Sequence, residues 1–506
     1  MKAKNKFILI MVLLLLAMGL FYRLYGLGQN HSFWTDETQT AVFARAILQR
    51  GLPVLENGYT PTVYLPFWYY FPAFFMKMMG VNELAARLPS VIFGALTILA
   101  VFWLGKEMFN KNVGLLSALL VTFLKIEILW SRQARPYQLL QLLYLLAIFF
   151  FMRFLNLFKR DKKLEIRYFI WAIIIALLAA AIHPLGLLLF VYFFFYLVLF
   201  RWDILKKIYQ SFNKVILGFL LVLLIVLLWQ LNLLVALKTF FYGSWGETFK
   251  FHNHLYYYRV FLWQNYGLVS VLAFFGLIWA LFKRSKINVF LVVLLVIHLG
   301  FISFRLNQPF VRYLYIIFPI FILLAAYMSW EIISKIIKKE KFALLVMIFL
   351  SFLLMAFNSK FALKPQTVYS LNEDMQEIPE VDYQKIYEIV KTKLSENPQA
   401  VYMANWNDHA VWYLGEGSLN YLLRVTSSAD EKDPLSGAIF LKSLESLKEV
   451  IAKNPQGLIL LESWESELPE GTRDFIRNNL KKEYEVDRLY EQQPRFWPVE
   501  IYSWGI

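Results

Sequence analysis

The sequence predicts an all-α polytopic membrane domain followed by a small α/β domain. Hydrophobic residues make up 59% of its 506 residues, whereas soluble domains average about 45–50%. The chain carries repeated apolar runs long enough to cross the hydrocarbon core of a bilayer. From about residue 359 to its end it turns polar, with the mixed patterns of a folded domain outside the membrane.

The apolar runs predict about eleven transmembrane helices. They lie near residues 7–27, 88–105, 113–130, 137–156, 168–183, 185–200, 214–236, 266–282, 288–304, 311–331 and 342–358. The first run follows a basic start, but no small-residue cleavage site follows it, so we expect an uncleaved first span.

Lys and Arg set the expected orientation. Basic clusters such as "KAKNK", "FKRDKKLEIR" and "SKIIKKEK" fall on alternate loops, and such loops are usually cytoplasmic. The N-terminus is therefore expected inside, and an odd number of spans places the C-terminal segment outside the cytoplasm. The net charge of +15 needs no nucleic acid as its explanation, and the lack of cysteine excludes disulfides and a cysteine nucleophile.

The membrane domain is expected to cover residues 1–358, with a long outer loop at 28–87. In this loop "TQTAVFARAILQRG" has the spacing of an amphipathic helix, and "PTVYLPFWYYFPAFFMKMMG" is aromatic but interrupted by prolines. Proline breaks a helix, and Trp and Tyr favour the headgroup layer, so both segments are predicted to lie at the interface.

Residues 359–506 predict the separate α/β domain. "VDYQKIYEIVKTKLSE" has helical periodicity, whereas "QAVYMANW" and "GLILLESW" have the composition of short buried strands.

Two adjacent acids, Asp36 and Glu37, follow the first span in "HSFWTDETQ". One interpretation is structural, because Thr35 could cap the next helix and acids in a first turn are favoured by the helix dipole. The other is that one acid is a base at the membrane surface. Both interpretations stand on spacing alone.

Basic residues also occur on the predicted outer loops, where they are normally disfavoured. Arg132 and Arg135 lie in "LWSRQARPYQLLQ", His183 in "AAIHPLG" and Arg312 in "RLNQPFVRYLY". They either reach toward lipid headgroups or, together, bind an anionic ligand from the bilayer such as a lipid phosphate. A divalent ion held by Asp36 stays open, although no ligand cluster with recognisable spacing requires one.

Several of these segments, in their order, resemble one family. "FWTDE", "VNELAARLPSVIFGALTILAVFWLG", "WSRQARPYQLL" and "RYLYIIFP" are similar to segments of the dolichyl-phosphate-mannose-protein mannosyltransferases and of related bacterial enzymes, including the lipid A aminoarabinose transferase. The resemblance covers most of residues 1–330 and implies a GT-C fold and transfer of a sugar from a polyprenyl-phosphate donor. The chain lacks one feature of the aminoarabinose enzymes, which carry a Lys before Pro-Pro in the first outer loop. The comparable stretch of this chain reads "YTPTVYLPFWYY".

The resemblance also implies roles for residues. Asp36 matches the acid that acts at the acceptor, Glu37 its partner, and Arg132, Arg135 and Arg312 the donor-phosphate contacts, while the substrate pocket is expected to include Tyr64, Tyr137, His183 and Tyr313. Chemically, a sugar phosphate needs a base for the acceptor hydroxyl and cations for the departing phosphate. The expectation is an inverting single displacement onto a lipid, glycan or protein acceptor, with the arginines and Asp36 sharing one outer cavity.

Two other classes remain open. A transporter or flippase of lipid-linked sugars would also use outer arginines, but it would carry polar residues through the middle of its spans. The predicted spans are mostly Leu, Ile, Phe and Val there, which favours the transferase. An anchored binding module would instead use the C-terminal domain, where Trp406, Trp412 and Tyr413 could face a sugar or form a core.

Overall fold

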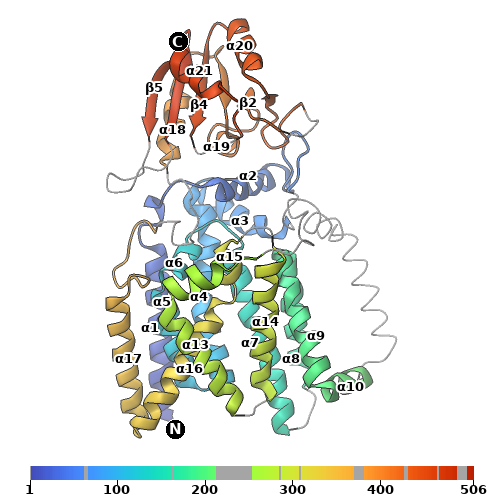
Figure 1. Ribbon diagram of the computed structural model, residues 1–506, viewed down its shortest axis with the longest axis vertical. Coiled ribbons are helices and arrows are strands. Elements are labelled where there is room, and N and C mark those ends of the chain that lie inside the picture. Colours follow the sequence, from blue (N-terminus) through green and yellow to red (C-terminus); the bar gives the residue numbers. More distant parts are fainter. Residues whose placement is uncertain are drawn as a thin grey trace. The chain divides into compact units, whose positions relative to one another are not determined.

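The computed structural model describes residues 2–61, 66–161, 165–211, 253–283, 286–306, 309–369, 381–426, 431–463, 467–486 and 498–506 (Figure 1). Two compact units divide the chain. Unit 1 comprises Met1–Leu27, Thr62–Trp68 and Arg87–Gln376, and unit 2 comprises Gly28–Pro61, Tyr69–Ala86 and Glu377–Ile506.

Unit 1 is built from helices. Those described are α1 (Lys2–Leu24), α4 (Glu83–Met108, whose first residues belong to unit 2), α5 (Lys111–Phe123), α6 (Lys125–Ser131), α7 (Tyr137–Asp161), α8 (Ile166–Ile182), η3 (Pro184–Leu187), α9 (Leu188–Phe200), α10 (Trp202–Ser211), η4 (Tyr257–Asn265, of π type), α13 (Gly267–Phe282), α14 (Lys286–Phe304), α15 (Val311–Tyr315), α16 (Phe318–Ile336) and α17 (Glu340–Phe357). The short η2 (Pro66–Tyr69) crosses into unit 2.

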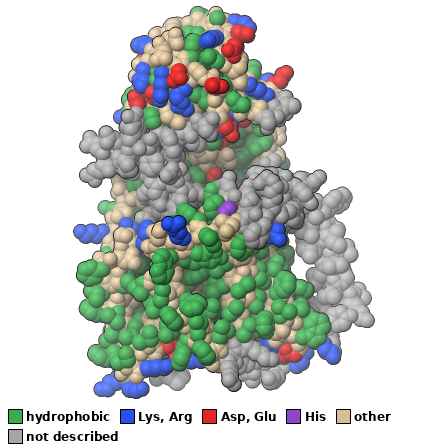
Figure 2. Space-filling model, viewed as in Figure 1, with side chains coloured by type: hydrophobic (Ala, Val, Ile, Leu, Met, Phe, Trp, Pro, Cys, Tyr) green, Lys and Arg blue, Asp and Glu red, His purple; other side chains and the backbone are tan. Residues whose placement is uncertain are grey.

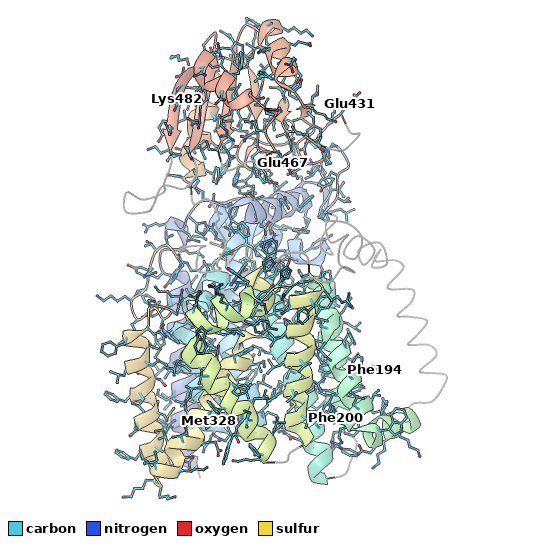
Figure 3. The ribbon with its side chains drawn as sticks, in the orientation of Figure 1. Phe194, Phe200, Met328, Glu431, Glu467 and Lys482 are labelled. Carbon is cyan, nitrogen blue, oxygen red and sulfur yellow. The ribbon has the colours of Figure 1, made fainter. Side chains whose placement is uncertain are left out.

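The surface of unit 1 is that of a membrane protein. Figure 2 shows hydrophobic side chains in a broad band over its helices. Phe194 and Phe200 on α9 are 58% and 40% exposed, and both are labelled in Figure 3. A soluble protein rarely exposes so large an apolar surface, because burying it is favourable.

Within the described residues, five helices are long and apolar enough to cross a membrane, or up to seven if each bent pair counts as one span. Helices occur at the expected apolar runs that the structure describes, although 113–130 and 311–331 are each divided between two helices. The total of about eleven spans stays a prediction. The expected span at 214–236 lies outside the described residues.

One expected span, 113–130, is two helices rather than one. Leu124 separates α5 from α6 with an extended backbone, and it forms an isolated antiparallel bridge with Phe361. The amide of Lys125 donates to the carbonyl oxygen of Lys360 at 2.9 Å. The backbone groups freed by the break are thus satisfied within the protein, as a membrane region requires.

Unit 2 contains a six-stranded mixed sheet of order β3-β2-β1-β4-β6-β5. The strands are β1 (Val401–Ala404), β2 (Tyr421–Leu423), β3 (Ile439–Leu441), β4 (Gly457–Glu462), β5 (Lys481–Val486) and β6 (Val499–Trp504). Strands β1 to β4 are parallel to their neighbours in this set, and β6 pairs antiparallel with both β4 and β5. The two strands expected from the sequence are β1 and β4, and they pair directly.

Apolar cores cover both faces of this sheet. Alternate residues of β1 and β4 point to opposite sides, so Tyr402 and Leu460 join one core and Met403 and Ile459 the other. The first core includes α18 (Tyr383–Glu396), which is the helix expected from its periodicity, and the second includes α20 (Leu444–Lys453) and α21 (Thr472–Asn479). The predicted fold class, a helical membrane part with a small α/β part, is confirmed.

The first long loop packs with the sheet in unit 2. Its helix α2 (Thr35–Arg50) ends at Gly51, whose φ of 78° favours glycine, and α3 (Tyr70–Met79) packs against α2. Arg45 donates to the carbonyl oxygens of Val411 and Trp412 on the short helix α19 (Asp408–Tyr413). The predicted division of the chain into two domains at residue 358 stays a prediction. The contacts place most of this loop, Gly28–Pro61 and Tyr69–Ala86, in the same unit as Glu377–Ile506.

Candidate functional site

Five of the predicted site residues lie together in unit 1. They come from three short segments between the longer helices. Arg135 and Tyr137 lie where the α6–α7 connection enters α7, His183 separates α8 from η3, and Arg312 and Tyr313 lie on α15. We call these five side chains the arginine–tyrosine cluster. All five are buried.

Tyr137 is the centre of the cluster. The guanidinium carbons of Arg135 and Arg312 lie 5.7 and 5.6 Å from the centre of its ring. The ring of His183 lies 5.4 Å from that of Tyr137 and 6.5 Å from that of Tyr313. Aromatic faces attract cations, so Tyr137 can hold two guanidinium groups near each other in spite of their repulsion.

His183 adds an N–H hydrogen-bond donor to this cluster. Its Nδ1 accepts the backbone amide of Leu185 at 3.1 Å, which caps η3. In the neutral imidazole the hydrogen must then be on Nε2. Arg135 and Arg312 both lie close enough to His183 to act on it electrostatically. Two guanidinium groups and an N–H donor in one buried place form an environment suited to an anion, because a negative charge offsets the repulsion of the two cations.

A layer of contacts positions the cluster. Trp130 packs against Tyr137 at 5.1 Å and against Tyr315 at 5.8 Å between ring centres. The hydroxyl of Tyr315 donates to Glu127 at 3.0 Å, and Nε2 of His298 lies 2.8 Å from the carbonyl oxygen of Tyr313. These bonds fix α15, and with it Arg312.

Arg132 has different surroundings from the other two predicted phosphate ligands. Its guanidinium nitrogens donate to the carbonyl oxygens of Tyr25 and Thr367, both at 2.6 Å, and also to those of Arg23 and Gly26. It therefore ties the end of α1 to the chain near residue 367. Its role as a donor-phosphate ligand stays a prediction, and the contacts seen here are structural.

A buried polar network around Arg23 and Glu127 was not singled out from the sequence. Arg23 donates through Nε to the hydroxyl of Ser131 at 2.9 Å and lies in the electrostatic reach of Glu127. Glu127 accepts from Gln141 at 3.0 Å. Glu127 lies on α6, and Arg23 lies in the last turn of α1. The only sequence signal of Arg23 was its position four residues before the predicted end of the first span at residue 27.

In unit 2, Asp36 and Glu37 lie in the first turn of α2. Trp34 is the N-cap residue, and no side chain caps this end, so the expected capping by Thr35 is wrong. Glu37 is buried and Asp36 half-buried. Asp36 lies close enough to Asp408 on α19 to raise the pKa of that carboxyl, while Gln39 on α2 hydrogen-bonds to Asp408.

The remaining predictions concern Tyr64 and a metal. Tyr64 lies outside the described residues. Among the residues that the structure does describe, no group of three or more His, Asp or Glu side chains is arranged to hold a metal ion. The roles predicted for the individual site residues, Asp36 and Glu37 included, stay predictions.

Comparison with known proteins gives a family profile and similar folds. Residues 61–229 match the sequence profile of the dolichyl-phosphate-mannose-protein mannosyltransferase family. No curated protein sequence matches the chain significantly. The fold is similar to that of ArnT from Cupriavidus metallidurans in the apo state, with a TM-score of 0.65, 14% identity and 97% of each chain covered.

Two further solved structures are similar. ArnT from Cupriavidus metallidurans bound to undecaprenyl phosphate has a TM-score of 0.61 at 13% identity, with 97% of each chain covered. The archaeal oligosaccharyltransferase AglB from Archaeoglobus fulgidus, in complex with an inhibitory peptide and a dolichol-phosphate, has a TM-score of 0.54 at 12% identity, over 91% of this chain and 70% of that one. The chain has the fold of the GT-C glycosyltransferases, and the resemblance seen in the sequence is confirmed.

Proposed function

We propose that this protein is an integral membrane glycosyltransferase. It moves a sugar from a polyprenyl-phosphate donor to a hydroxyl group of an acceptor. The observation that carries the proposal is the arginine–tyrosine cluster, in which Arg135, Arg312 and His183 surround Tyr137 inside unit 1. Similar proteins are solved with undecaprenyl phosphate and dolichol-phosphate, and the cluster has the chemistry that a lipid phosphate needs.

The reaction is a single displacement at the anomeric carbon. The acceptor oxygen forms a bond to this carbon while the bond from the carbon to the phosphate oxygen breaks, and the bonding electrons leave with the polyprenyl phosphate. Arg135 and Arg312 stabilise the negative charge that develops on this leaving group. The acceptor's proton passes to a carboxylate, a role that we assign to Asp36 because the family resemblance implies it. Configuration at the anomeric carbon is inverted.

Transport of a lipid-linked sugar is the alternative, and the contacts of unit 1 favour transfer. The buried polar groups described here, from Arg23 and Glu127 to Gln141, bond to one another around α6 and α7. Such closed networks stabilise one structure. A transporter, in contrast, needs a polar path that reorganises between two states.

Activity of the purified chain tests the proposal. The protein in detergent is incubated with radiolabelled polyprenyl-phosphate sugars of several kinds and with lipid, glycan and peptide acceptors. We expect label to move to one acceptor class, with release of polyprenyl phosphate and an inverted linkage by mass and NMR analysis. Donor movement across a vesicle bilayer without any transfer would reject the transferase in favour of the transporter.

The orientation is part of the proposal. We place the N-terminus in the cytoplasm and unit 2 on the opposite side, because basic clusters occur on alternate loops. The chain contains no cysteine, so single cysteines at residue 36 and at residue 450 can be labelled directly in intact cells. Both should react with a membrane-impermeant thiol reagent. Labelling of one and protection of the other would contradict this topology.

A further inference from the structure

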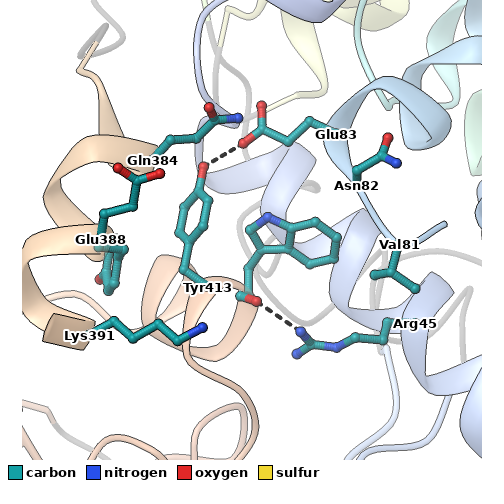
Figure 4. A pocket seen from close by; sticks show the side chains of 10 residues that line it. Arg45, Val81, Asn82, Glu83, Gln384, Glu388, Lys391 and Tyr413 are labelled. Carbon is teal, nitrogen blue, oxygen red and sulfur yellow. Dashed lines mark hydrogen bonds between the residues drawn. The ribbon is translucent and has the colours of Figure 1, made fainter. Parts of the chain in front are cut away.

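Unit 2 contains a cavity of about 340 Å³ between α18, α19, α2 and the start of α4. Figure 4 shows it with Arg45, Glu83, Glu388, Lys391 and Tyr413 around it. The volume lies near the lower end of the range of about 300–1,000 Å³ for ligand pockets. All of its lining residues belong to unit 2.

One wall of the cavity comes from α18. Gln384, Glu388 and Lys391 follow one another at helical spacing, so they share a face of the helix, and they are exposed. Tyr387 lies buried behind them and stacks on Tyr413, with ring centres 5.1 Å apart and planes inclined by 20°. This wall thus has a polar rim over an aromatic base.

The rest of the lining is held in place by internal bonds. The hydroxyl of Tyr413 donates to Glu83 at 2.5 Å. Arg45 donates to the carbonyl oxygens of Val411 and Trp412 at 2.6 and 2.8 Å, and its guanidinium lies 5.3 Å from the Trp412 ring. Figure 4 shows the bond between Tyr413 and Glu83 and one of the bonds of Arg45 as dashed lines. A site whose walls are already ordered loses little entropy when a ligand binds.

The charges around the cavity decide the class of ligand. Two cations, Arg45 and Lys391, are balanced by two carboxylates, Glu83 and Glu388. A phosphate or another strong anion would meet both carboxylates, and desolvating a like-charge contact is unfavourable. Carboxylates accept pairs of hydroxyl hydrogens and the ammonium group donates, which matches a ring that carries many hydroxyl groups. The tyrosine rings have electron-rich faces that attract the weakly positive C–H groups of such a ring.

We infer that this cavity binds an uncharged sugar residue. Binding itself is independent of the transferase proposal. The further statement that the sugar belongs to a glycan acceptor rests on the proposed function. Trp412 and Tyr413 are among the aromatic residues that the sequence indicates as able to face a sugar. Their spacing does not indicate that α18, Arg45 and Glu83 complete the site.

The test uses the purified full chain in detergent. The methyl glycosides of glucose, galactose, mannose and N-acetylglucosamine are titrated and detected by saturation-transfer NMR. We expect at least one of them to bind, and Glu388→Ala and Lys391→Ala each to weaken it by about tenfold, the value of one good hydrogen bond to a charged group. A matched control is Glu449→Ala with Lys453→Ala, an ion pair on α20 whose side chains are 70% and 76% exposed.

Each outcome decides the inference. If no glycoside binds, or if the α18 variants bind like the α20 controls, the cavity is not a sugar site. Stronger binding of inorganic phosphate than of any glycoside also overturns it. The substituted side chains are exposed, so thermal unfolding should match that of the original chain. If glycosides bind but no acceptor ever receives a sugar, the transferase proposal fails while the sugar site stands.

Discussion

The imidazole of His409 hydrogen-bonds through Nε2 to the carbonyl oxygen of Phe33, at 2.9 Å. One face of the imidazole is covered by Tyr383, which stacks on it with ring centres 3.6 Å apart and donates to Glu462 at 2.8 Å. Phe33 immediately precedes the turn in which α2 begins. A residue of α19 therefore fixes the start of the helix that carries Asp36.

The first prediction follows from this bond. His409→Ala leaves the buried carbonyl group of Phe33 without this donor and should lower the free energy of unfolding by about 1–3 kcal/mol. Under the proposed function it should also lower turnover, because the helix start would be less well positioned. His409→Gln carries an amide donor at nearly the same reach and should restore much of both. Thermal unfolding and transfer rates of the full chain measure the two effects. Equal loss in both variants would show that only packing matters.

The second prediction concerns the pH dependence of stability. The pKa of Asp408 is raised from its ordinary value of 3.8 to about 7. Burial is the largest cause, and the nearby Asp433 and Asp36 act in the same direction, while the hydrogen bond from Gln39 and the charge of Arg424 oppose the change. The folded chain thus holds this proton more tightly than the unfolded chain. Its contribution to stability is full below the unfolded pKa and is lost as the pH rises through the folded one.

As the pH rises from the unfolded to the folded pKa, Asp408 alone lowers the free energy of unfolding by up to about 4 kcal/mol, at about 1.4 kcal/mol for each unit of pKa. Asp408→Asn removes the titration and should flatten the decline of stability between about pH 4 and pH 7. Denaturation midpoints of the full chain across this range check it. Asp474→Asn, on α21, provides the control. The prediction is contradicted if the pH profiles of stability are parallel for the original chain, Asp408→Asn and Asp474→Asn.

The third prediction separates the arginines. Arg312→Ala should weaken donor use, seen as a rise in the donor KM by about ten- to hundredfold, because one charged contact to phosphate is lost. Arg132→Ala should instead lower the free energy of unfolding by about 1.5–3 kcal/mol, because its four carbonyl contacts tie α1 to the chain near Thr367. Arg312→Lys keeps the charge without the planar fork and should fall in between.

The donor KM and the free energy of unfolding, measured for both Arg312→Ala and Arg132→Ala, distinguish a phosphate ligand from a structural arginine. If Arg132→Ala changes only the donor KM and Arg312→Ala only stability, the assignment drawn from the contacts is reversed. If neither changes the donor KM, the arginine–tyrosine cluster is not a phosphate site.

Local pattern was sufficient for much of this fold. Helix α18 follows from its periodicity, and strands β1 and β4 follow from their short apolar composition, since both strands bury side chains on both faces of the sheet. Arg135, His183 and Arg312 could be selected because cations are disfavoured on the predicted outer loops. The sequence carried no sign that these residues meet at Tyr137, which depends on how three connections pack together.

Features that depend on contacts between distant parts of the chain could not be predicted from the sequence. No Gly or Pro marks the break at Leu124, because the break depends on a backbone bridge to Phe361 from a distant part of the chain. Likewise nothing in "TQTAVFARAILQRG" shows that Arg45 will bind carbonyl oxygens of α19. An amphipathic helix has the same pattern whether its apolar face covers lipid or another helix.

The last prediction concerns Asp36. Asp36→Asn preserves the size of the side chain in the first turn of α2 but removes the carboxylate that would accept the acceptor's proton. If Asp36 is the general base, turnover should fall by about 10²–10⁴-fold while donor binding and thermal unfolding stay near those of the original chain. If it only stabilises the start of α2, the change should cost less than ~1 kcal/mol of stability and leave turnover intact.

Glu56→Gln is the matched control for Asp36→Asn. Glu56 belongs to the same loop, is 71% exposed and pairs with Arg50 at 3.1 Å. An exposed ion pair contributes little, so this variant should keep both stability and turnover. The pH profile adds an independent readout, because a lost general base also removes the acidic limb of the kcat profile. Turnover of Asp36→Asn equal to that of Glu56→Gln, with the same acidic limb, would reject Asp36 as the base.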